Sequence, residues 1–277
     1  MATSEGSLTR EQVSEYRQSG FLILRGFFTP EEVLEIRDVF MAQAAEGVVP
    51  SLSDVIPNLP PDDPLSRYPR MLHPHRHLNL PVGAVSLRYL LDPRIEGVLC
   101  TLLEDEPIAA QTMFYFKPPG ARGQALHQDN FYLRVKPGVC LGAWLALDDA
   151  TPENGGIVVV PESHRLDIIC PTSADLTRSF VTDRVIVPKE YVELPLHLHS
   201  GDMLFFHGNL IHGSYPNESR TLFRRAFICH YIPRRSLEVS HWFNPFYTFQ
   251  GTQVSVQEAE GGGPCGVVQT RTEAWNG

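Results

Sequence analysis

The sequence lacks the features that mark several classes of protein. No apolar run approaches the roughly 18 residues that a bilayer span needs, so no membrane span or membrane partner is expected. The N-terminal stretch MATSEGSLTREQ is polar and has no apolar segment, which argues against a secretory signal. The five cysteines are an odd number without any CxxC pair. We therefore expect free thiols in a reducing compartment, by default the cytoplasm, and neither a disulfide framework nor a structural zinc site.

Basic residues are also scarce. The chain has 23 Lys and Arg against 32 Asp and Glu, which gives a formal net charge of −9. A general nucleic-acid binder needs a basic surface to displace counterions, so nucleic acid is not an expected partner. The 277 residues, 43% hydrophobic and 20% charged, are ordinary for a soluble globular chain of one large or two small domains. The sequence does not specify an oligomeric state.

Capping signals predict helices in the first part of the chain. Thr9 with Gln12 fits a capping box, and Thr29 with Pro30 combines an N-cap with proline at the first helical position. Residues 48–82 are irregular and rich in proline, and so long a loop is often functional or mobile. The helices expected from these signals and from apolar periodicity cover about residues 10–19, 30–47, 84–91 and 93–104, with a short buried strand at 21–24.

From about residue 108 the pattern changes to short apolar runs separated by Gly, Pro and Asn. This rhythm is typical of an antiparallel sandwich or barrel. The expected strands cover residues 111–116, 139–147, 157–160, 184–188, 202–206 and 225–232. No shift in composition separates two domains. We therefore expect a single domain over residues 1–250, with a helical part over 1–105 and a β core over 106–235, followed by a partly flexible tail over 251–277.

His127 and Asp129 form the sharpest chemical signal. If this stretch is extended, both side chains project from the same face, because strand side chains alternate. An imidazole beside a carboxylate supplies two ligands for a divalent metal, and His212 is the best candidate for a third. Two His and one carboxylate leave three positions open, which is the arrangement of non-haem Fe(II) oxygenases. Alone, the HxD pattern also occurs by chance, as a surface His beside an Asp that caps a turn.

Arg224 follows His212 by twelve residues, in a segment that alternates like a half-buried strand. An arginine that points into a β-lined pocket is costly unless it meets an anion. A dicarboxylate co-substrate would suit it, because guanidinium binds carboxylate through two parallel hydrogen bonds. Neighbouring strand residues face opposite sides, so we expect one of Arg224 and Arg225 to be solvated.

Further motifs surround these residues in a recognisable order. They are QTMFYFKPPG at 111–120, LHQD at 126–129, AW at 143–144, ENGGIVVVPESHR at 153–165, GDMLFFH at 201–207, IHGS at 211–214 and FRRA at 223–226. In order and spacing, over roughly residues 10–235, the sequence resembles the phytanoyl-CoA dioxygenase family of Fe(II)/2-oxoglutarate oxygenases. The resemblance implies a mainly β fold with flanking helices (α+β), a double-stranded β-helix or cupin-like jelly-roll barrel, with its core over 106–235.

The resemblance also implies a site, with Fe(II) as the metal and 2-oxoglutarate and O2 as co-substrates. The implied residues are His127, Asp129 and His212 for iron, Arg224 and Ser214 for the distal carboxylate of 2-oxoglutarate, and Met113, Gln128, Trp144 and Arg76 for the rest of the co-substrate site. Because the carboxylate ligand is present, oxygen transfer is expected. In the related halogenases a small residue stands there so that chloride can bind.

Candidates for substrate contact flank the iron ligands or lie in the 48–82 loop. They are Tyr115, Asn130, Tyr132, His73 and His75. An aromatic segment after the barrel, with Trp242, Phe243, Phe246 and Tyr247, could be a lid or an oligomer contact, although core packing is the default for such residues.

We expect hydroxylation of an unactivated C–H bond of a small organic substrate, such as an amino acid or natural product, with release of succinate and CO2. Desaturation, ring formation and demethylation would start from the same hydrogen abstraction. Three alternatives stay open: an acyl-CoA 2-hydroxylase of the same family, a non-catalytic metal- or ligand-binding jelly roll, and an iron-free cupin-type isomerase. Binding of a CoA ester would require basic residues at the pocket entrance to contact its phosphates. The net charge of −9 argues mildly against such a substrate.

Overall fold

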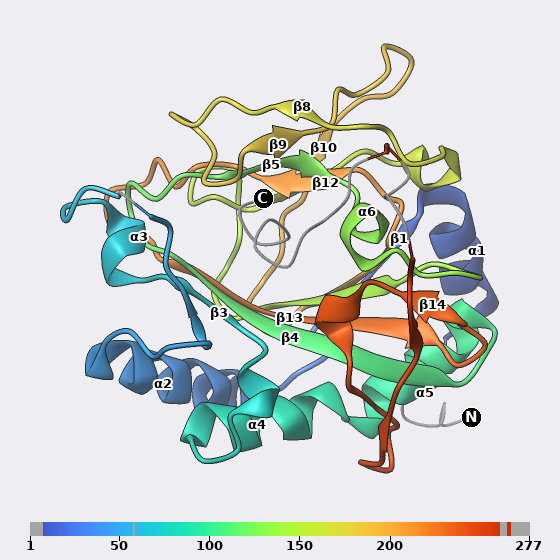
Figure 1. Ribbon diagram of the computed structural model, residues 1–277. Coiled ribbons are helices and arrows are strands. Elements are labelled where there is room, and N and C mark those ends of the chain that lie inside the picture. Colours follow the sequence, from blue (N-terminus) through green and yellow to red (C-terminus); the bar gives the residue numbers. More distant parts are fainter. Residues whose placement is uncertain (1–7, 58, 261–264, 267–277) are drawn as a thin grey trace.

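Two facing β-sheets form the body of the computed structural model, and helices cover the outer face of the larger sheet (Figure 1). The structure describes residues 8–57, 59–260 and 265–266. This arrangement confirms the predicted jelly-roll fold. The predicted division between domain and tail at residue 250 stays a prediction, and the tail falls partly on residues 261–264 and 267–277, which lie outside the described residues.

The larger sheet has nine strands within the described ranges, and the registered pairs are all antiparallel. Along the sheet they are β1 (Phe21–Leu24), β11 (Met203–His207), β6 (Leu141–Ala146), β13 (Arg224–Pro233), β4 (Pro107–Lys117), β15 (Phe246–Tyr247) and β16 (Gln253–Val254), with β3 (Arg70–Leu72) joining β4 and β2 (Ser53–Asp54) joining β3.

The smaller sheet lies across from it and carries part of the candidate site. Its order is β10 (Leu194–Pro195), β7 (Ile157–Val159), β12 (His212–Ser214) and β5 (Gln124–His127). Two short pairs complete the strands: β14 (Glu238–Val239) with β17 (Gln257–Glu258), and β8 (Thr172–Ser173) with β9 (Asp183–Arg184). The predicted strand at 184–188 is therefore wrong beyond its first residue, because the chain leaves β9 after Arg184.

The helices begin where the capping signals predicted. Thr9 and Gln12 form the capping box of the first helix, and Thr29 and Glu32 form that of the second. Gly20 ends the first helix with a φ of 84°, and a side chain there would collide with the His164 ring. The helices are α1 (Arg10–Ser19), α2 (Pro30–Glu46), α3 (Pro64–Arg67), α4 (Pro81–Leu90), α5 (Pro93–Leu103), α6 (Asp129–Leu133), and the 3-10 turns η1 (Pro74–Arg76), η2 (Ser163–Arg165) and η3 (His241–Phe243). None of the helices in the described part of the chain is both long and apolar enough to cross a membrane.

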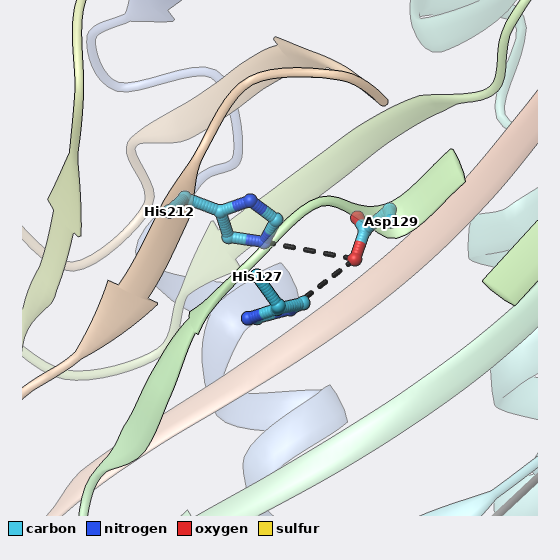
Figure 2. Close-up of side chains that lie close together, drawn as sticks. All are labelled: His127, Asp129 and His212. Atoms are coloured by element: carbon cyan, nitrogen blue, oxygen red, sulfur yellow. Dashed lines mark ion pairs between the residues drawn. The ribbon is translucent and has the colours of Figure 1, made fainter. Parts of the chain in front are cut away.

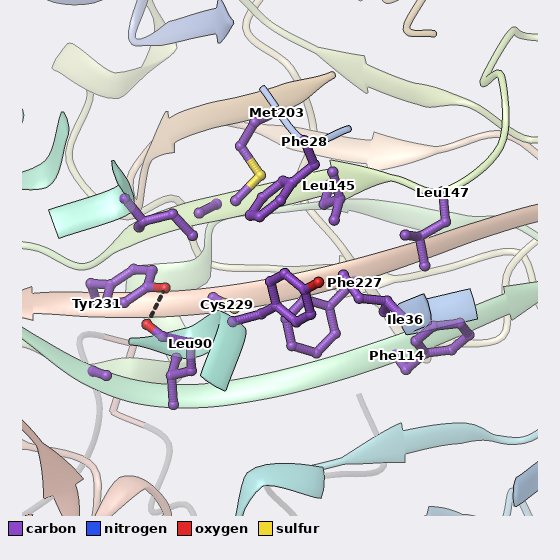
Figure 3. Close-up of a cluster of buried hydrophobic side chains, with 14 of the residues drawn as sticks. Phe28, Ile36, Leu90, Phe114, Leu145, Leu147, Met203, Phe227, Cys229 and Tyr231 are labelled. Carbon is purple, nitrogen blue, oxygen red and sulfur yellow. Dashed lines mark hydrogen bonds between the residues drawn. The ribbon is translucent and has the colours of Figure 1, made fainter. Parts of the chain in front are cut away.

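Strand β13 shows how the core holds the site in place. Its alternate residues Phe227, Cys229 and Tyr231 face the helices, and the Tyr231 hydroxyl donates to the Leu90 carbonyl at 2.8 Å (Figure 3). Burying such side chains contributes roughly 1.5–3 kcal/mol each. The residues between them face the other sheet, and among these His230 is 2% exposed. Packing against the helices therefore fixes which side chains β13 presents to the barrel interior.

Cys170 and Cys265 form a disulfide with a Cα–Cα distance of 5.6 Å. The expectation of free thiols is wrong for this pair, although Cys100, Cys140 and Cys229 are free. The two cysteines are 95 residues apart in the sequence, so no short cysteine motif indicated that they would pair. The cytoplasmic location inferred from the cysteines stays a prediction.

Candidate metal centre and co-substrate pocket

A pocket lies between the two sheets and holds about 90 Å³ of space for solvent. Its walls come from β4 and β13 of the larger sheet and from β5 and β12 of the smaller one. The three predicted iron ligands line it, together with Arg224 and Ser214. The barrel thus gathers residues that are up to about a hundred positions apart in the sequence.

His127, Asp129 and His212 converge at one point of this pocket (Figure 2). Each offers one ligand atom, and these atoms lie within 4.8 Å of one another. His212 stands opposite His127 in the pairing of β12 with β5. Asp129 Oδ1 lies 3.3 Å from His127 Nε2 and 3.7 Å from His212 Nε2.

The route to this geometry differs from the expected one. The stretch is not extended throughout, because β5 ends at His127 and helix α6 begins at Asp129. The change from strand to helix between these two residues brings the Asp129 carboxylate beside the His127 imidazole. The alternation of side chains along a strand does not place it there. The three predicted residues converge, but the extended backbone expected for this stretch was wrong.

Backbone carbonyls set the orientation of both imidazoles. His127 Nδ1 lies 2.9 Å from the Ala125 carbonyl, and His212 Nδ1 lies 3.0 Å from the Leu210 carbonyl. A carbonyl can only accept, so each Nδ1 donates and each Nε2 keeps its lone pair. Both lone pairs belong to the nitrogens nearest Asp129, which is the arrangement that a bound metal requires.

The protonation states also suit a metal. Burial alone would raise the pKa of Asp129, but the neighbouring His212 and His230, together with the contacts of the carboxylate with His127 and His230, hold that pKa well below its ordinary value. Burial lowers the pKa of His212 to about 4, against the opposing attraction of Asp129. Near neutral pH the carboxylate is therefore ionised and this imidazole neutral, as ligands must be. Two imidazoles and one carboxylate are a ligand set that fits Fe(II).

A second polar group lies further along the pocket, where Arg224 stands opposite Lys117 in the pairing of β13 with β4. Both side chains are buried, at 1% and 2% exposure. Arg224 Nε donates to the Gly155 carbonyl at 3.1 Å, while Nη1 has no hydrogen-bond partner among the described residues. Lys117 Nζ donates to Ser214 Oγ and to the Tyr215 carbonyl, each at 2.7 Å.

The two cations lack a carboxylate in the described ranges. Burial, and secondarily the charge of Arg224, lowers the pKa of Lys117 well below its usual value. Burial lowers the pKa of Arg224 to about 10, so its guanidinium remains charged at neutral pH. A buried charge without a counter-ion is costly. A bound carboxylate would supply the missing negative charge.

Arg225 differs from what the sequence suggested. It faces away from Arg224, as strand alternation requires, but it is not solvated. Its guanidinium forms two hydrogen bonds with Asp148, at 2.7 and 2.6 Å, and its side chain is 15% exposed. Arg224 is therefore the member of the pair that reaches the pocket.

Several other predicted residues line the pocket. Trp144 lies under Arg224, with 5.6 Å between its ring and the guanidinium carbon. Of the aromatic segment, Trp242 and Phe243 reach the pocket, whereas Phe246 and Tyr247 are buried in the hydrophobic core. The predicted residues that line the pocket are His127, Asp129, His212, Arg224, Ser214, Met113, Trp144, Tyr115 and Tyr132.

Two residues predicted for the co-substrate site do not line the pocket. Gln128 is fully buried and points into the loops, where it accepts from the Ile169 amide at 2.8 Å and donates to the Asn209 carbonyl at 2.9 Å. Arg76 donates to the Phe243 carbonyl at 2.9 Å. The predicted contacts of Gln128 and Arg76 with 2-oxoglutarate are therefore not supported, because both side chains form hydrogen bonds with backbone groups of neighbouring loops.

Three of the substrate candidates are also placed elsewhere. Asn130 accepts from the Val135 amide at 3.2 Å and so closes the turn after α6. His75 is fully buried, with Nδ1 2.8 Å from the Thr112 hydroxyl. His73 packs its ring 6.3 Å from that of Phe243. None of these three lines the pocket, and their expected contact with substrate is not supported.

Polar residues of the site without a predicted role include His230 and Arg70, which line the pocket, and Lys117, which lies beside Arg224. Lys117 stood in a quoted motif, but its position beside Arg224 depends on the register of β4 with β13. His230 lies in the same alternating segment as Arg224, at even spacing, which was an available signal. Arg70 lines the pocket and donates to the Tyr115 hydroxyl at 3.3 Å, and its charge is paired with Asp54.

Comparison with known proteins agrees with the motifs. The family model of phytanoyl-CoA dioxygenase matches residues 16–226. Phytanoyl-CoA dioxygenase 1 of Oryza sativa subsp. japonica is 29% identical over 273 residues, which cover 85% of this chain and 92% of the relative. Phytanoyl-CoA dioxygenase domain-containing protein 1 of Mus musculus is 25% identical over 289 residues, covering 86% and 95%.

Solved structures share the fold at lower identity. The non-heme alpha-ketoglutarate-dependent carbocyclase SnoK from nogalamycin biosynthesis is 21% identical, with a TM-score of 0.63 over 85% of this chain and 88% of that one. EvdO2 from Micromonospora carbonacea, complexed with 2-oxoglutarate, is also 21% identical, with a TM-score of 0.61 over 83% and 93%. At this identity the likeness concerns the fold.

Proposed function

The chain belongs to the phytanoyl-CoA dioxygenase family, and from this premise we propose that it hydroxylates an unactivated C–H bond of a small organic substrate. It is a non-haem Fe(II)- and 2-oxoglutarate-dependent dioxygenase. The observation that carries the proposal is one pocket that holds both a buried His127–Asp129–His212 set and Arg224, whose guanidinium has no carboxylate partner among the described residues. The overall reaction consumes substrate, 2-oxoglutarate and O2, and yields hydroxylated substrate, succinate and CO2.

His127, Asp129 and His212 would hold the iron. Bound there, Fe(II) with 2-oxoglutarate supplies the oxidising power that breaks the C–H bond, while the protein binds, orients and excludes water. The ionised Asp129 would partly neutralise the charge of the metal, and both imidazoles are preset by the carbonyls that hold their Nδ1 atoms. Three protein ligands leave room for co-substrates at a divalent iron.

Arg224 and Ser214 would hold the distal carboxylate of 2-oxoglutarate. Ser214 Oγ already accepts from Lys117 Nζ at 2.7 Å and from the Gln124 amide at 3.3 Å, so its own hydrogen is left to donate to an anion. Met113 and Trp144 also line the pocket, and the Trp144 ring lies beside the Arg224 guanidinium. The charge of Arg224 would thus draw the dicarboxylate in and align its other end with the iron ligands.

Apart from the site residues named above, the pocket lining is largely apolar. Aromatic and aliphatic side chains line it, and the charge of Arg70 is already neutralised by Asp54. This lining favours an uncharged portion of the substrate near the iron, as in a natural product or the side chain of an amino acid. The acyl chain of a CoA ester would also suit such a lining, so an acyl-CoA 2-hydroxylase, consistent with the names of the relatives, is the second candidate.

Succinate release in the presence of Fe(II) and O2 separates these possibilities. We expect 2-oxoglutarate to be converted to succinate well above the uncoupled background when an amino acid or aromatic natural product is offered, and a chelator to abolish this. Stimulation by acyl-CoA thioesters alone would favour the second candidate. Intact iron binding with no succinate from any substrate class would contradict the proposal and favour a non-catalytic jelly roll.

A further inference from the structure

His230 is a buried histidine on β13 that contacts Asp129 but does not belong to the three-residue metal set. Its Nε2 lies 2.8 Å from Asp129 Oδ2, and its side chain is 3% exposed. On its other side, Nδ1 lies 3.1 Å from the Gln111 amide nitrogen. Gln111 is the residue opposite His230 in the pairing of β13 with β4. The three side chains therefore form a buried chain of hydrogen bonds from Gln111 through His230 to Asp129.

The direction of these hydrogen bonds follows from the chemistry of the groups. An ionised carboxylate can only accept, so His230 Nε2 carries a hydrogen and donates it to Asp129. The Gln111 amide nitrogen can only donate, so His230 Nδ1 accepts with its lone pair. Both contacts are satisfied by one neutral tautomer of His230. Gln111 thereby fixes the tautomer that delivers a donor to the carboxylate.

The two oxygens of Asp129 are consequently used differently. His230 occupies Oδ2, whereas Oδ1 faces His127 Nε2 at 3.3 Å and His212 Nε2 at 3.7 Å. We propose that His230, held by Gln111, is a positioning residue that turns Oδ1 toward the iron and keeps Asp129 a one-oxygen ligand. This inference rests on the proposed function. A carboxylate that bound through both oxygens would take up a position needed by 2-oxoglutarate or O2.

The backbone at His230 is held more rigidly by the fold than the backbone at Asp129. Strand β13 lies between β6 and β4 in the larger sheet, and its outward residues Cys229 and Tyr231 are packed under the helices. Asp129 stands at the first position of the five-residue helix α6. A hydrogen bond from the sheet therefore restrains a carboxylate that its own short helix would hold less rigidly.

Two substitutions of His230 test the donor specifically. His230→Leu removes the donor at similar bulk, while His230→Gln can place an amide N–H near the same point. We expect His230→Leu to bind Fe(II) about 10- to 100-fold more weakly in anaerobic calorimetry without 2-oxoglutarate, the range seen when partners of metal ligands are removed. His230→Gln should stay within a few-fold of wild type. Cys229→Ala, on the same strand but the opposite face, is the matched control and should bind as wild type.

A second readout reports the positions left for the co-substrate. With Fe(II) saturating, the visible charge-transfer absorption formed on adding 2-oxoglutarate should be weakened or shifted in His230→Leu and restored in His230→Gln. Gln111→Leu, which keeps His230 but removes its anchor, should lower Fe(II) affinity several-fold. This variant keeps the test available if His230→Leu does not fold.

Several results would overturn the inference. They are wild-type affinity and absorption in both His230→Leu and Gln111→Leu, equal losses in His230→Gln and His230→Leu, or an equal loss in Cys229→Ala, which would indicate general loosening of β13. Failure of the proposed function would be seen elsewhere, in a wild-type protein that binds Fe(II) but forms no absorption band with 2-oxoglutarate.

Discussion

Replacing His212 by alanine should abolish turnover and iron binding together. The residue supplies one of three converging ligand atoms, and a metal held by His127 and Asp129 alone loses both affinity and its fixed orientation. If at least about 4 kcal/mol of transition-state stabilisation is lost, the rate falls roughly 1,000-fold or more. The fold should survive, because β12 is held by backbone pairing with β5 and β7 on its two sides. Iron content after anaerobic loading and succinate release would be measured on the same sample.

His207 provides the matched control for this prediction. It lies five residues earlier, packs its ring 5.4 Å from that of His164 and accepts from the Asn209 amide at 3.1 Å. It does not line the pocket. His207→Ala should therefore keep its iron and most of its activity. Equal loss of iron in the two alanine variants, or full iron content in His212→Ala, would show that the ligand set is wrongly assigned.

Replacing Arg224 by methionine should raise the KM for 2-oxoglutarate while leaving Fe(II) affinity nearly unchanged. A hydrogen bond to a charged group is worth about 1.5–3 kcal/mol, which corresponds to roughly a 10- to 150-fold weaker interaction. Methionine keeps most of the length of the side chain and removes the guanidinium, with its buried charge and its hydrogen bond to the Gly155 carbonyl. Arg224→Lys should recover part of the affinity, because it restores the charge without the planar fork. Steady-state kinetics with varied 2-oxoglutarate would give the KM.

The neighbouring residue serves as the control in this case. Arg225→Met breaks an ion pair with Asp148 outside the pocket, so it should lower stability and leave the KM for 2-oxoglutarate near the wild-type value. If Arg224→Met binds 2-oxoglutarate as tightly as wild type, or if both variants lose affinity equally, Arg224 is not the anion-binding residue.

Features set by local interactions were predictable from the sequence. The capping boxes at Thr9 and Thr29 fixed the starts of α1 and α2, since each depends on residues three positions apart. Strand alternation predicted that Arg224 and Arg225 face opposite sides, and the family resemblance singled out Arg224 for the co-substrate. The HxD motif named two of the three converging ligands, although a turn, and not a strand, brings Asp129 beside His127.

Features set by distant pairing were not predictable from local patterns. Gln111 meets His230 and Lys117 meets Arg224 only because β4 and β13 pair in one particular register across more than a hundred residues. A residue shift in that register would send each side chain to the other face. Gln128 and Arg76 were assigned from the family resemblance, but both bind loop backbone that only the folded chain brings near. The Cys170–Cys265 bond has the same long-range origin.

The central claim is that this pocket binds Fe(II) and 2-oxoglutarate together, and anaerobic titration followed by visible absorption tests it most directly. We predict a weak charge-transfer band that appears only when both are present, is absent with succinate in place of 2-oxoglutarate, is lost in His127→Ala and is weakened in Arg224→Met. Tight Fe(II) binding without any such band in the wild-type protein would contradict the account.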